Sequence, residues 1–346
     1  MNTQVLIPDD ETYALAAEIL KAGGLVAFPT ETVYGLGGDA LNAASSGKIY
    51  EAKGRPSDNP LIVHIYKTED LYGIVEDVPA VALELARRYW PGPLTMISRK
   101  NSAVPSQTTG GLDTVAVRFP SHPVAKAFIE AAGGFVAAPS ANISGKPSPT
   151  QGRHVLEDMD GRIDMIIDSG PCSIGIESTI IDLTSGAPML LRPGYVNEKM
   201  LASVTGRVDK DPAVFGICDE SVKPKAPGMK YRHYAPRGRI TIVSGDKDDV
   251  IRFIRKKTDE KENGVRIGVL AGTEDKGCFP EADLVADMGR ADNGTETASK
   301  LYDVLRRCDE ENIDEIYSEE FNTPELGLAI MNRLIKAAGH KIVKVG

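Results

Sequence analysis

Short apolar runs recur through the first part of the chain, separated by polar segments that contain glycine or proline. Runs of this kind that are rich in valine and isoleucine are typical of buried strands. We expect strands at residues 25–28, 61–66, 94–98, 114–119, 135–138, 164–168, 178–183 and 189–192. Intervening stretches predict helices at residues 11–22, 79–89, 122–132 and 196–203. This alternation predicts an α/β domain around one large twisted sheet.

The pattern changes after residue 205. Residues 206–238 contain several prolines and lysines but no periodic apolar positions, which predicts a linker. Strands expected at 239–244, 265–272, 314–318 and 341–345 then alternate with helices expected at 247–257, 295–308 and 325–338. Such alternation implies a small parallel sheet. We therefore expect a first domain over residues 1–205, the linker, and a second α/β domain over residues 239–346.

Composition narrows the classes of function. A formal net charge of −9 argues against a protein whose whole surface binds nucleic acid. No apolar run approaches the ~20 residues of a membrane-spanning helix, and the acidic start does not resemble a signal peptide, so we expect a cytoplasmic protein without a membrane partner. The four cysteines form no C-x-x-C pair and the five histidines no H-x-x-x-H pair, which predicts no intrinsic metal site.

A polar segment, PTETVYGLGG at 29–38, follows the first predicted strand and offers the hydroxyls of Thr30 and Thr32. We expect a loop here, because its three glycines give the backbone freedom to turn. Considered alone, the motif is explained equally well by a glycine-rich turn with solvated hydroxyls.

Two cations, Lys53 and Arg55, flank a glycine, and Pro56 prevents a helix from continuing past them. Cations held side by side suit a polyanion, because an arginine fork matches phosphate oxygens and a lysine adds a mobile point charge. The competing interpretation is an exposed helix end that carries two cations.

Arg118 and His64 are a charged and a titratable side chain on predicted strands. Arg118 shares a strand face with Thr114, because side chains alternate along a strand. A charge on a central strand needs an anionic partner, and the pattern does not decide between a protein carboxylate and a ligand carboxylate. His64 lies on the strand face opposite Val63, where a lone histidine is more often a satisfied polar group than a catalyst.

The loops after later strands are rich in hydroxyl, amide and arginine groups. They contribute Ser140, Asn142, Ser148, Ser178 and Arg192. Together with the two cations, such donors are what a bound triphosphate requires. The chain has no G-x-x-x-x-G-K-[ST] loop, and GLGGD is not G-x-G-x-x-G, so a standard glycine-loop cradle is excluded. No Ser-His-Asp or Cys-His order with supporting context indicates a hydrolase.

Taken in order, these motifs resemble those of the threonylcarbamoyl-AMP synthase family, of the YrdC/Sua type. The matching segments are PTETVYGLG, KIYEAKGRPSDNPL, WPGPLT, TVAVRFPSHP, APSANISGKPSPT, ESTIID and LLRPG. The segment APGMKYRHYAP and the α/β unit after it are similar to the longer, two-domain branch of that family. The resemblance implies a large mixed-sheet YrdC-like domain, a smaller Rossmann-like parallel α/β domain, and a linker that acts as a lid.

The resemblance also implies a role for each matching position. The catalytic, nucleotide-lining set corresponds to Lys53, Arg55, Ser140 and Asn142. ATP contacts are implied for Arg55, Asn59, Thr114, Ser140, Ser148, Arg192, His233 and Tyr234. Threonine contacts are implied for Thr30, Thr32, His64, Arg118, Ala138 and Ser178, with Arg118 on the carboxylate.

The implied reaction joins L-threonine, bicarbonate and ATP into threonylcarbamoyl-AMP and pyrophosphate, which is nucleotidyl transfer. Mg²⁺ would enter with ATP and keep most of its waters. A tRNA threonylcarbamoyl-transferase complex would pass the group to adenosine 37 of tRNA, and the protein itself would contact tRNA weakly at most. A basic groove without an obvious nucleophile fits this reaction, because positioning and charge neutralisation are its main needs.

Two other functions are compatible with parts of the sequence. The same basic groove could act as an RNA-binding module, although the acidic chain lacks an aromatic platform and an RNA-binding signature. Carbamoyl transfer in hydrogenase maturation uses a similar domain, but those proteins resemble larger chains with C-x-x-C pairs. Residues 239–346 show no phosphate loop or catalytic constellation, so we expect a regulatory or lid-supporting role for them.

Overall fold

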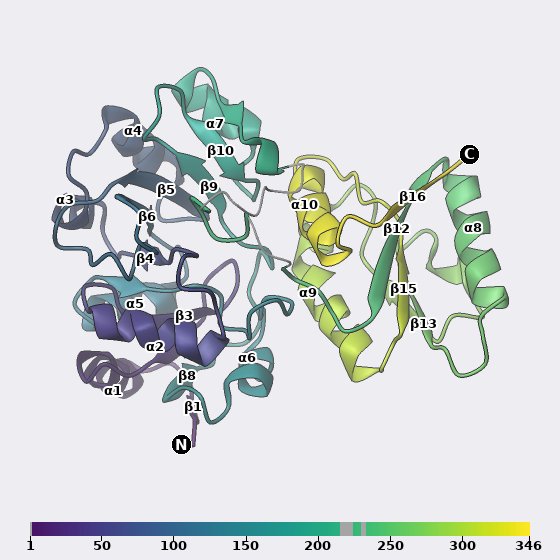
Figure 1. Cartoon of the computed structure of the whole chain (residues 1–346), viewed down its shortest axis with the longest axis horizontal. Coiled ribbons are helices and arrows are strands. Elements are labelled where there is room, and N and C mark those ends of the chain that lie inside the picture. Colours follow the sequence, from purple (N-terminus) through teal and green to yellow (C-terminus); the bar gives the residue numbers. More distant parts are fainter. Residues whose placement is uncertain (1, 215–223, 230–232) are drawn as a thin grey trace. The chain divides into compact units, whose positions relative to one another are not determined.

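The computed structural model of the protein describes residues 2–214, 224–229 and 233–346. The chain divides into two compact units (Figure 1). The first comprises residues 1–144 and 148–231, and the second comprises residues 145–147 and 232–346. The predicted linker therefore contributes residues to both units, and its segments 215–223 and 230–232 lie outside the described residues.

The first unit is built around an 11-stranded mixed sheet. In spatial order its strands are β1 (Gln4–Leu6), β8 (Met165–Ile167), β2 (Val26–Phe28), β3 (Gly35–Asp39), β7 (Val136–Ala137), β4 (Ile62–His64), β6 (Thr114–Arg118), β5 (Leu94–Arg99), β9 (Thr179–Asp182), β10 (Met189–Arg192) and β11 (Asp209–Lys210). β4 and β6 run parallel, whereas β5 and β6 run antiparallel. The predicted large mixed sheet is confirmed, and every strand predicted for this domain has a counterpart.

The prediction of a loop throughout residues 29–38 is wrong, because Gly35–Asp39 forms β3 between β2 and β7. Glycine weakens an isolated strand, but it allows a close approach of neighbouring chains. A Cβ atom on Gly37 would lie 2.9 Å from Val136 Cγ1 and 3.0 Å from the Val26 carbonyl oxygen. The glycines of this segment therefore serve packing within the sheet as well as turning.

Helices cover the sheet and connect its strands. They are α1 (Asp10–Lys21), α2 (Ala43–Lys53), α3 (Leu71–Ile74), α4 (Ala80–Tyr89), α5 (Pro123–Ala131), α6 (Gly152–Met159) and α7 (Glu198–Thr205), with 3₁₀ turns at Thr68–Asp70 and Pro212–Val214. The Asp9 carboxylate caps α1 by accepting a hydrogen bond from the Thr12 amide at 2.7 Å. Gly54 ends α2 with a φ of 58°, a left-handed conformation that favours glycine. The pattern did not predict α2, because AASSGKIYEAK has no continuous apolar stripe.

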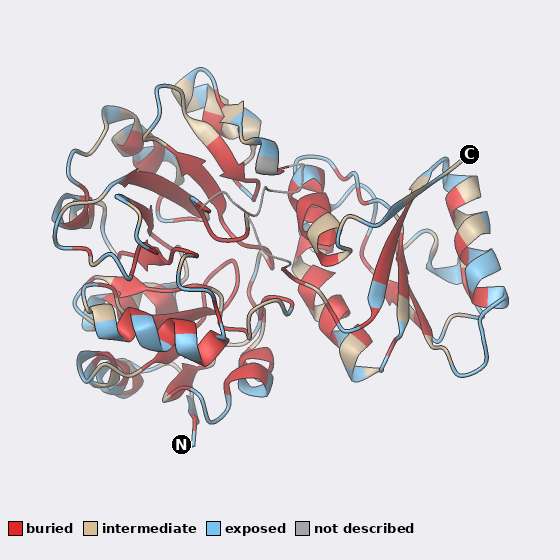
Figure 2. Cartoon of the chain, in the orientation of Figure 1, coloured by how far each residue is buried: buried red, intermediate tan, exposed pale blue. Residues whose placement is uncertain are grey.

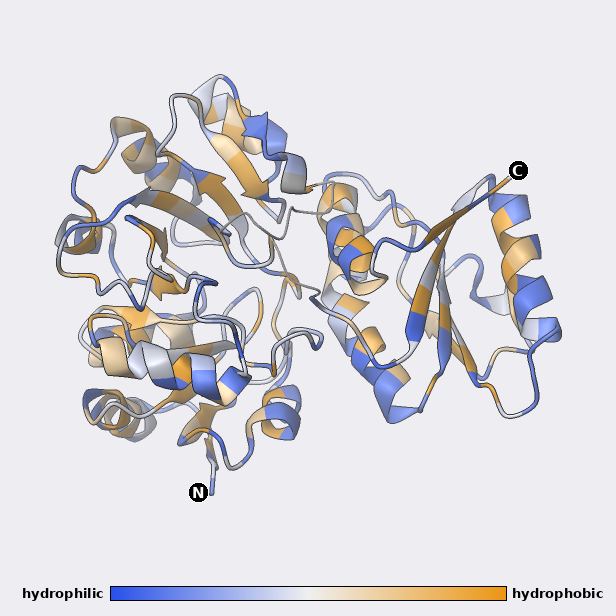
Figure 3. Cartoon of the chain, in the orientation of Figure 1, coloured by the Kyte–Doolittle hydropathy of each residue, from blue (hydrophilic) through white to orange (hydrophobic). Residues whose placement is uncertain are grey.

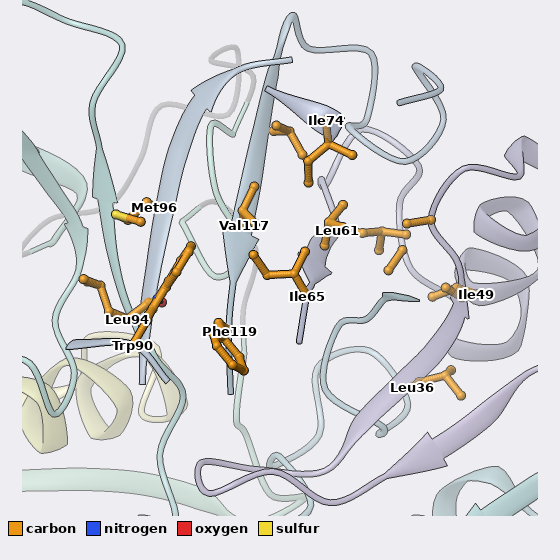
Figure 4. Close-up of a cluster of buried hydrophobic side chains, with 14 of the residues drawn as sticks. Leu36, Ile49, Leu61, Ile65, Ile74, Trp90, Leu94, Met96, Val117 and Phe119 are labelled. Carbon is orange, nitrogen blue, oxygen red and sulfur yellow. The ribbon is translucent and has the colours of Figure 1, made fainter. Parts of the chain in front are cut away.

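Alternate side chains of the central strands enter different apolar clusters. Leu61 and Ile65, which flank β4, join Val117 in the large cluster that Figure 4 shows. Ile62 instead packs with Ala116 in a second cluster. Figure 2 shows that the central strands are buried along their length. Polar side chains on these strands are consequently removed from water, which makes their partners important.

The second unit contains a five-stranded parallel sheet in the order β14-β13-β15-β12-β16. Its elements are β12 (Arg239–Gly245), α8 (Lys247–Asp259), β13 (Ile267–Ala271), a 3₁₀ turn (Lys276–Cys278), β14 (Leu284–Asp287), α9 (Gly294–Glu310), β15 (Glu315–Ser318), α10 (Gly327–Ala337) and β16 (Ile342–Val345). Figure 1 shows α8 on one face of the sheet and α9 and α10 on the other. Figure 3 shows hydrophobic and hydrophilic positions alternating along α8, as expected of a helix that covers a sheet. The predicted parallel α/β unit is confirmed, with β14 as an additional strand.

Candidate functional site

Backbone hydrogen bonds join the loops that carry the predicted site residues. The Tyr34 amide donates to the Pro149 carbonyl, and the Ala141 amide donates to the Tyr34 carbonyl, each at 2.8 Å. The Ile174 amide donates to the Glu31 carbonyl at 2.8 Å. Segments far apart in the sequence therefore meet in one place, next to the start of β3.

Lys53 is the last residue of α2 and is only 1 % exposed. Its ammonium group donates hydrogen bonds to the carbonyl oxygens of Ser140, at 2.6 Å, and of Asn142. The Ser140 hydroxyl donates to the side-chain oxygen of Asn142 at 2.6 Å. Lys53 therefore does end a helix, but the interpretation of its cation as exposed is wrong, and Lys53, Ser140 and Asn142 lie together.

Arg55 follows the end of α2 and is 8 % exposed. Its guanidinium group donates to the carbonyl oxygens of Asn59 at 3.2 Å and Pro60 at 3.0 Å, which fixes the loop after the helix. The side-chain oxygen of Asn59 is buried and has no hydrogen-bond partner among the described residues. Leaving a buried acceptor unpaired costs free energy, so this oxygen suits a donor on a ligand.

Three polar side chains occupy matching positions on adjacent strands. The register pairs His64 of β4 with Arg118 of β6, and Arg118 with Thr95 of β5. Arg118 is 4 % exposed, and its Nη2 atom lies 2.8 Å from Oε1 of Glu31. This contact is an ion pair without hydrogen-bond geometry, because none of these atoms has a hydrogen bond within the part of the chain that the structure describes. Arg118 thus has a protein carboxylate beside it and can still donate to a second carboxylate.

The His64 ring is buried in the sheet, with Nδ1 3.1 Å from the Ile62 carbonyl oxygen. Burial, followed by the nearby positive charge of Arg118, lowers the pKa of His64 to about 3. The imidazole is therefore neutral at physiological pH, and it adds no positive charge to a site that already contains buried cations.

We expect His64 to reduce stability as the pH falls below about 6.5, its pKa in an unfolded chain. Because the pKa of His64 is lower in the folded protein, the unfolded chain binds the proton first as the pH falls. The folding stability that the protein has above pH 6.5 is therefore lost progressively on acidification. Between pH 6.5 and pH 5 this one group should lower the free energy of unfolding by about 2 kcal/mol. Urea unfolding of wild type and His64→Gln at both pH values measures this difference. An equal loss in both proteins would contradict a buried neutral imidazole.

Ser178 and Arg192 extend the polar row formed by β4, β6 and β5. The Ser178 hydroxyl lies 2.7 Å from the Thr95 hydroxyl. Arg192 is buried and donates to the Ser178 carbonyl at 3.0 Å and to its hydroxyl at 3.1 Å. In the adjoining loops, the Ser148 hydroxyl donates to Oε1 of Glu177 at 2.6 Å. Thr95, Ser178 and Arg192 therefore form one hydrogen-bonded cluster, and Glu177, the partner of Ser148, precedes Ser178 in the chain.

The other residues predicted to contact substrates take different positions. Thr30 and Thr32 are buried in the loop after β2, with their hydroxyl oxygens 2.8 Å apart. Ala138 follows β7, and its amide donates to a carbonyl of β4 at 2.8 Å. Thr114 begins β6, so the length of that strand separates it from Arg118. Thr30 and Thr32 flank Glu31, the partner of Arg118, and Ala138 is bonded to β4, whereas Thr114 and Arg118 are at opposite ends of β6.

Part of the linker packs on the first unit. Ala226 is buried in an apolar cluster with Leu191. The Pro227 carbonyl accepts a hydrogen bond from Arg192 at 3.4 Å, and Lys225 lies 3.7 Å from a carboxylate of β9. This stretch of linker is therefore in contact with a predicted ATP residue.

His233 and Tyr234 belong to the second unit, as does Tyr302. The rings of His233 and Tyr234 lie 5.5 Å apart, and those of Tyr234 and Tyr302 lie 5.3 Å apart. Aromatic pairs at these distances attract one another, which orders this end of the linker. Contact of His233 and Tyr234 with ATP remains a prediction from the resemblance.

The sequence analysis assigned no role to three residues of this network. Glu31 forms an ion pair with Arg118. The Thr95 hydroxyl contacts the Ser178 hydroxyl, and the Glu177 carboxylate accepts a hydrogen bond from the Ser148 hydroxyl. Their position inside the motifs PTETVYG, WPGPLT and ESTIID is the signal that could have found them.

Family models match most of the chain. Residues 18–194 match the Sua5/YciO/YrdC model, described as telomere recombination, and residues 196–339 match the C-terminal domain of threonylcarbamoyl-AMP synthase. The chain belongs to the Sua5/YciO/YrdC family. This family member is 48 % identical over 332 residues to a threonylcarbamoyl-AMP synthase of Pyrococcus abyssi, covering 96 % of this chain and 95 % of the relative. It is 46 % identical over 343 residues to that of Bacillus subtilis, covering 99 % and 97 %.

Solved structures agree with the family assignment. A crystal structure of Pyrococcus abyssi Sua5 complexed with L-threonine is 46 % identical to this Sua5/YciO/YrdC family member and has a TM-score of 0.92. The similarity covers 100 % of both chains. The two units of the present chain are therefore those of a two-domain Sua5 protein.

Across residues 2–214, 224–229 and 233–346, no helix is long and apolar enough to cross a membrane. Within the same ranges, no group of three or more His, Cys, Asp or Glu side chains is arranged to hold a metal ion.

Proposed function

We propose that this chain condenses L-threonine, bicarbonate and ATP to threonylcarbamoyl-AMP, with release of pyrophosphate. The observation that supports this most directly is that buried, hydrogen-bonded cationic and hydroxyl side chains lie at strand ends and in loops that backbone hydrogen bonds join. Relatives that cover nearly the whole chain bear the name threonylcarbamoyl-AMP synthase, and a related structure was solved with L-threonine. Both facts favour this reaction over other uses of the site.

The chemistry requires two bond-forming steps. The threonine amine first attacks the carbon of bicarbonate, and loss of water leaves an N-carboxylate. A carboxylate oxygen of that carbamate then attacks the α-phosphorus of ATP, and pyrophosphate leaves with the electrons of the broken P–O bond. Neither step needs a covalent bond to the protein. Positioning and stabilisation of negative charge are therefore the main tasks of the site.

We assign Lys53, Arg55 and Arg192 to the phosphates of ATP, and Arg118 to the threonine carboxylate. All four side chains are buried, and protein oxygens hold each one in a fixed direction. Charges that are already oriented need little reorganisation when negative charge develops on the reacting groups. Such an arrangement suits adenylyl transfer.

Mg²⁺ belongs to this proposal as part of the nucleotide substrate. In such sites Mg²⁺ keeps several waters and is held largely by phosphates, so few protein ligands are needed. The unpaired side-chain oxygen of Asn59, in the loop closed by Arg55, is an acceptor that could bind a metal-bound water. Mg²⁺ would neutralise phosphate charge alongside the fixed cations.

Pyrophosphate release tests the proposal directly. The full chain is incubated with ATP, Mg²⁺ and bicarbonate, and with threonine, serine, valine or no amino acid. We expect release that depends on both threonine and bicarbonate, with much lower rates for serine and valine, because each lacks one of the two groups on the threonine β-carbon. Release that is independent of the amino acid would instead identify an ATP pyrophosphohydrolase.

An RNA-binding module remains the alternative function for the same cations. It predicts tRNA affinity that falls steeply with salt, because phosphate contacts release counterions. It also predicts no pyrophosphate release. Transfer of the threonylcarbamoyl group to tRNA by a separate transferase complex is part of our proposal, and adding such a complex with tRNA to the reaction tests it.

A further inference from the structure

The second unit contains a cavity of about 400 Å³, and none of the residues assigned above lines it. Its walls come from the carboxyl end of β12, including Gly245, and from the segments that follow β13, β14 and β15, including Gly272, Gly289 and Glu319. β12 leads to α8 on one face of the sheet, whereas the neighbouring β15 leads to α10 on the other (Figure 1). In open parallel sheets, ligands bind at this kind of crevice beyond the carboxyl ends of the strands.

The charged residues of the cavity are mostly acidic. Four carboxylates, on Glu274, Asp275, Glu319 and Glu320, and one ammonium group, on Lys247, line it. The ammonium nitrogen of Lys247 lies 2.7 Å from Asp275, so that carboxylate neutralises it. The remaining carboxylates make the cavity repel anions and attract cations.

Two polar atoms in the wall are buried without a partner. Oε2 of Glu319 accepts a hydrogen bond from the Gly272 amide at 3.1 Å, whereas Oε1 has no hydrogen-bond partner in the described ranges. Thr323 is 7 % exposed, and its hydroxyl oxygen is likewise buried without one there. Unpaired polar atoms inside a protein cost free energy unless a ligand or water pairs with them. An ammonium group offers three donors, one of which can pair with Oε1 of Glu319.

The rest of the wall is apolar. Val243, Val250, Ile251 and Phe321 line the cavity beside the acidic groups. A ligand that fits both parts has a positive head and a hydrocarbon body, and the volume falls in the range typical of small-molecule sites. We propose that this cavity binds a small aliphatic amine, with its ammonium group on Glu319 and its carbon chain against the apolar wall. This site is independent of the proposed synthase reaction.

Titration of Glu319 should make the affinity depend on pH. Burial raises the pKa of Glu319 to about 7, while the Gly272 amide and Lys247 act to lower it and Asp275 and Glu274 to raise it. Glu320 also faces the cavity. The amine needs the ionised carboxylate, so its affinity should rise roughly tenfold from pH 6 to pH 8 as that carboxyl loses its proton.

Calorimetry on the full chain, with 1,4-diaminobutane as the probe, tests the site. At pH 8 we expect Glu319→Gln to weaken binding at least tenfold. Lys247→Met should strengthen it several-fold, because removing the lysine leaves Asp275 free to attract the amine. Glu262→Gln, which removes an exposed carboxylate outside the cavity, is the matched control and should change nothing.

Each probe has an outcome that overturns the proposal. Equal binding of 1,4-butanediol, which has the same carbon chain without charge, would show that no cation is recognised. Tighter binding of succinate, with weakening in Lys247→Met, would identify an anion site instead. Binding of Mg²⁺ alone that is lost in Glu319→Gln would identify a metal site. Diamine binding that is unchanged in both cavity variants would place the amine elsewhere on the chain.

Discussion

Lys53→Ala should slow threonine-dependent pyrophosphate release about 30- to 900-fold, which corresponds to roughly 2–4 kcal/mol of transition-state stabilisation. The ammonium group of Lys53 is buried and is held by the carbonyls of Ser140 and Asn142. It is therefore oriented before ATP binds, which is the condition under which a charge contributes most to catalysis. We expect a loss of similar size for Arg55→Ala. Steady-state kinetics with saturating bicarbonate measures both.

Lys48→Ala is the matched control for Lys53. Lys48 lies on the same helix but is exposed, and its ammonium group donates to the Gly23 carbonyl at 2.6 Å. Its removal deletes the same charge from α2 without touching the loop at Ser140, so activity should stay within twofold of wild type. Pyrophosphate release at the wild-type rate in Lys53→Ala would refute the assignment of this residue to the phosphates.

Arg118→Ala should raise the KM for threonine by roughly 10- to 150-fold, because a charge-assisted hydrogen bond is worth about 1.5–3 kcal/mol. The KM for ATP should change little, since three other cations are assigned to the phosphates. Titrating each substrate at a saturating level of the other separates the two effects. A collapse of ATP affinity with little change for threonine would mean that Arg118 has been assigned to the wrong substrate.

The same change should lower the free energy of unfolding by about 3–5 kcal/mol, because it leaves the Glu31 carboxylate buried without its cation. The double variant Glu31→Gln with Arg118→Ala should regain much of that stability without regaining threonine affinity. Arg99→Ala, which removes an exposed arginine from the neighbouring β5, should affect neither. Recovery of threonine affinity in the double variant would show that Arg118 acts only through folding.

The predicted strands illustrate what local pattern alone can determine. Alternation placed His64 and Val63 on opposite faces of one strand, and their burial in different surroundings agrees with that. Pro56 was enough to predict that no helix continues past Lys53 and Arg55, although α2 itself was not predicted, and Gly54 supplies the turn. These inferences succeeded because side-chain direction and helix termination depend on a few adjacent residues.

The sequence pattern could not predict contacts between residues that are far apart in the chain. Sequence reasoning required an anion for Arg118 but could not choose between a ligand and Glu31, which lies far from it along the chain. Nor could it foresee that Lys53 would be buried, because burial depends on the loop at Ser140 folding over the helix end. Such contacts follow from topology rather than from periodicity.

The sequence by itself determined the two α/β units, the order of the motifs, and the residue types able to hold a nucleotide beside an amino acid. The tertiary structure alone decided that Gly35–Asp39 is a strand, because a glycine-rich segment gains its order from neighbours on both sides. It also created the acidic cavity of the second unit, whose walls come from segments that meet only when parallel strands align. The chemical groups of a residue are set by the sequence, whereas their partners and their burial are set only when the chain folds.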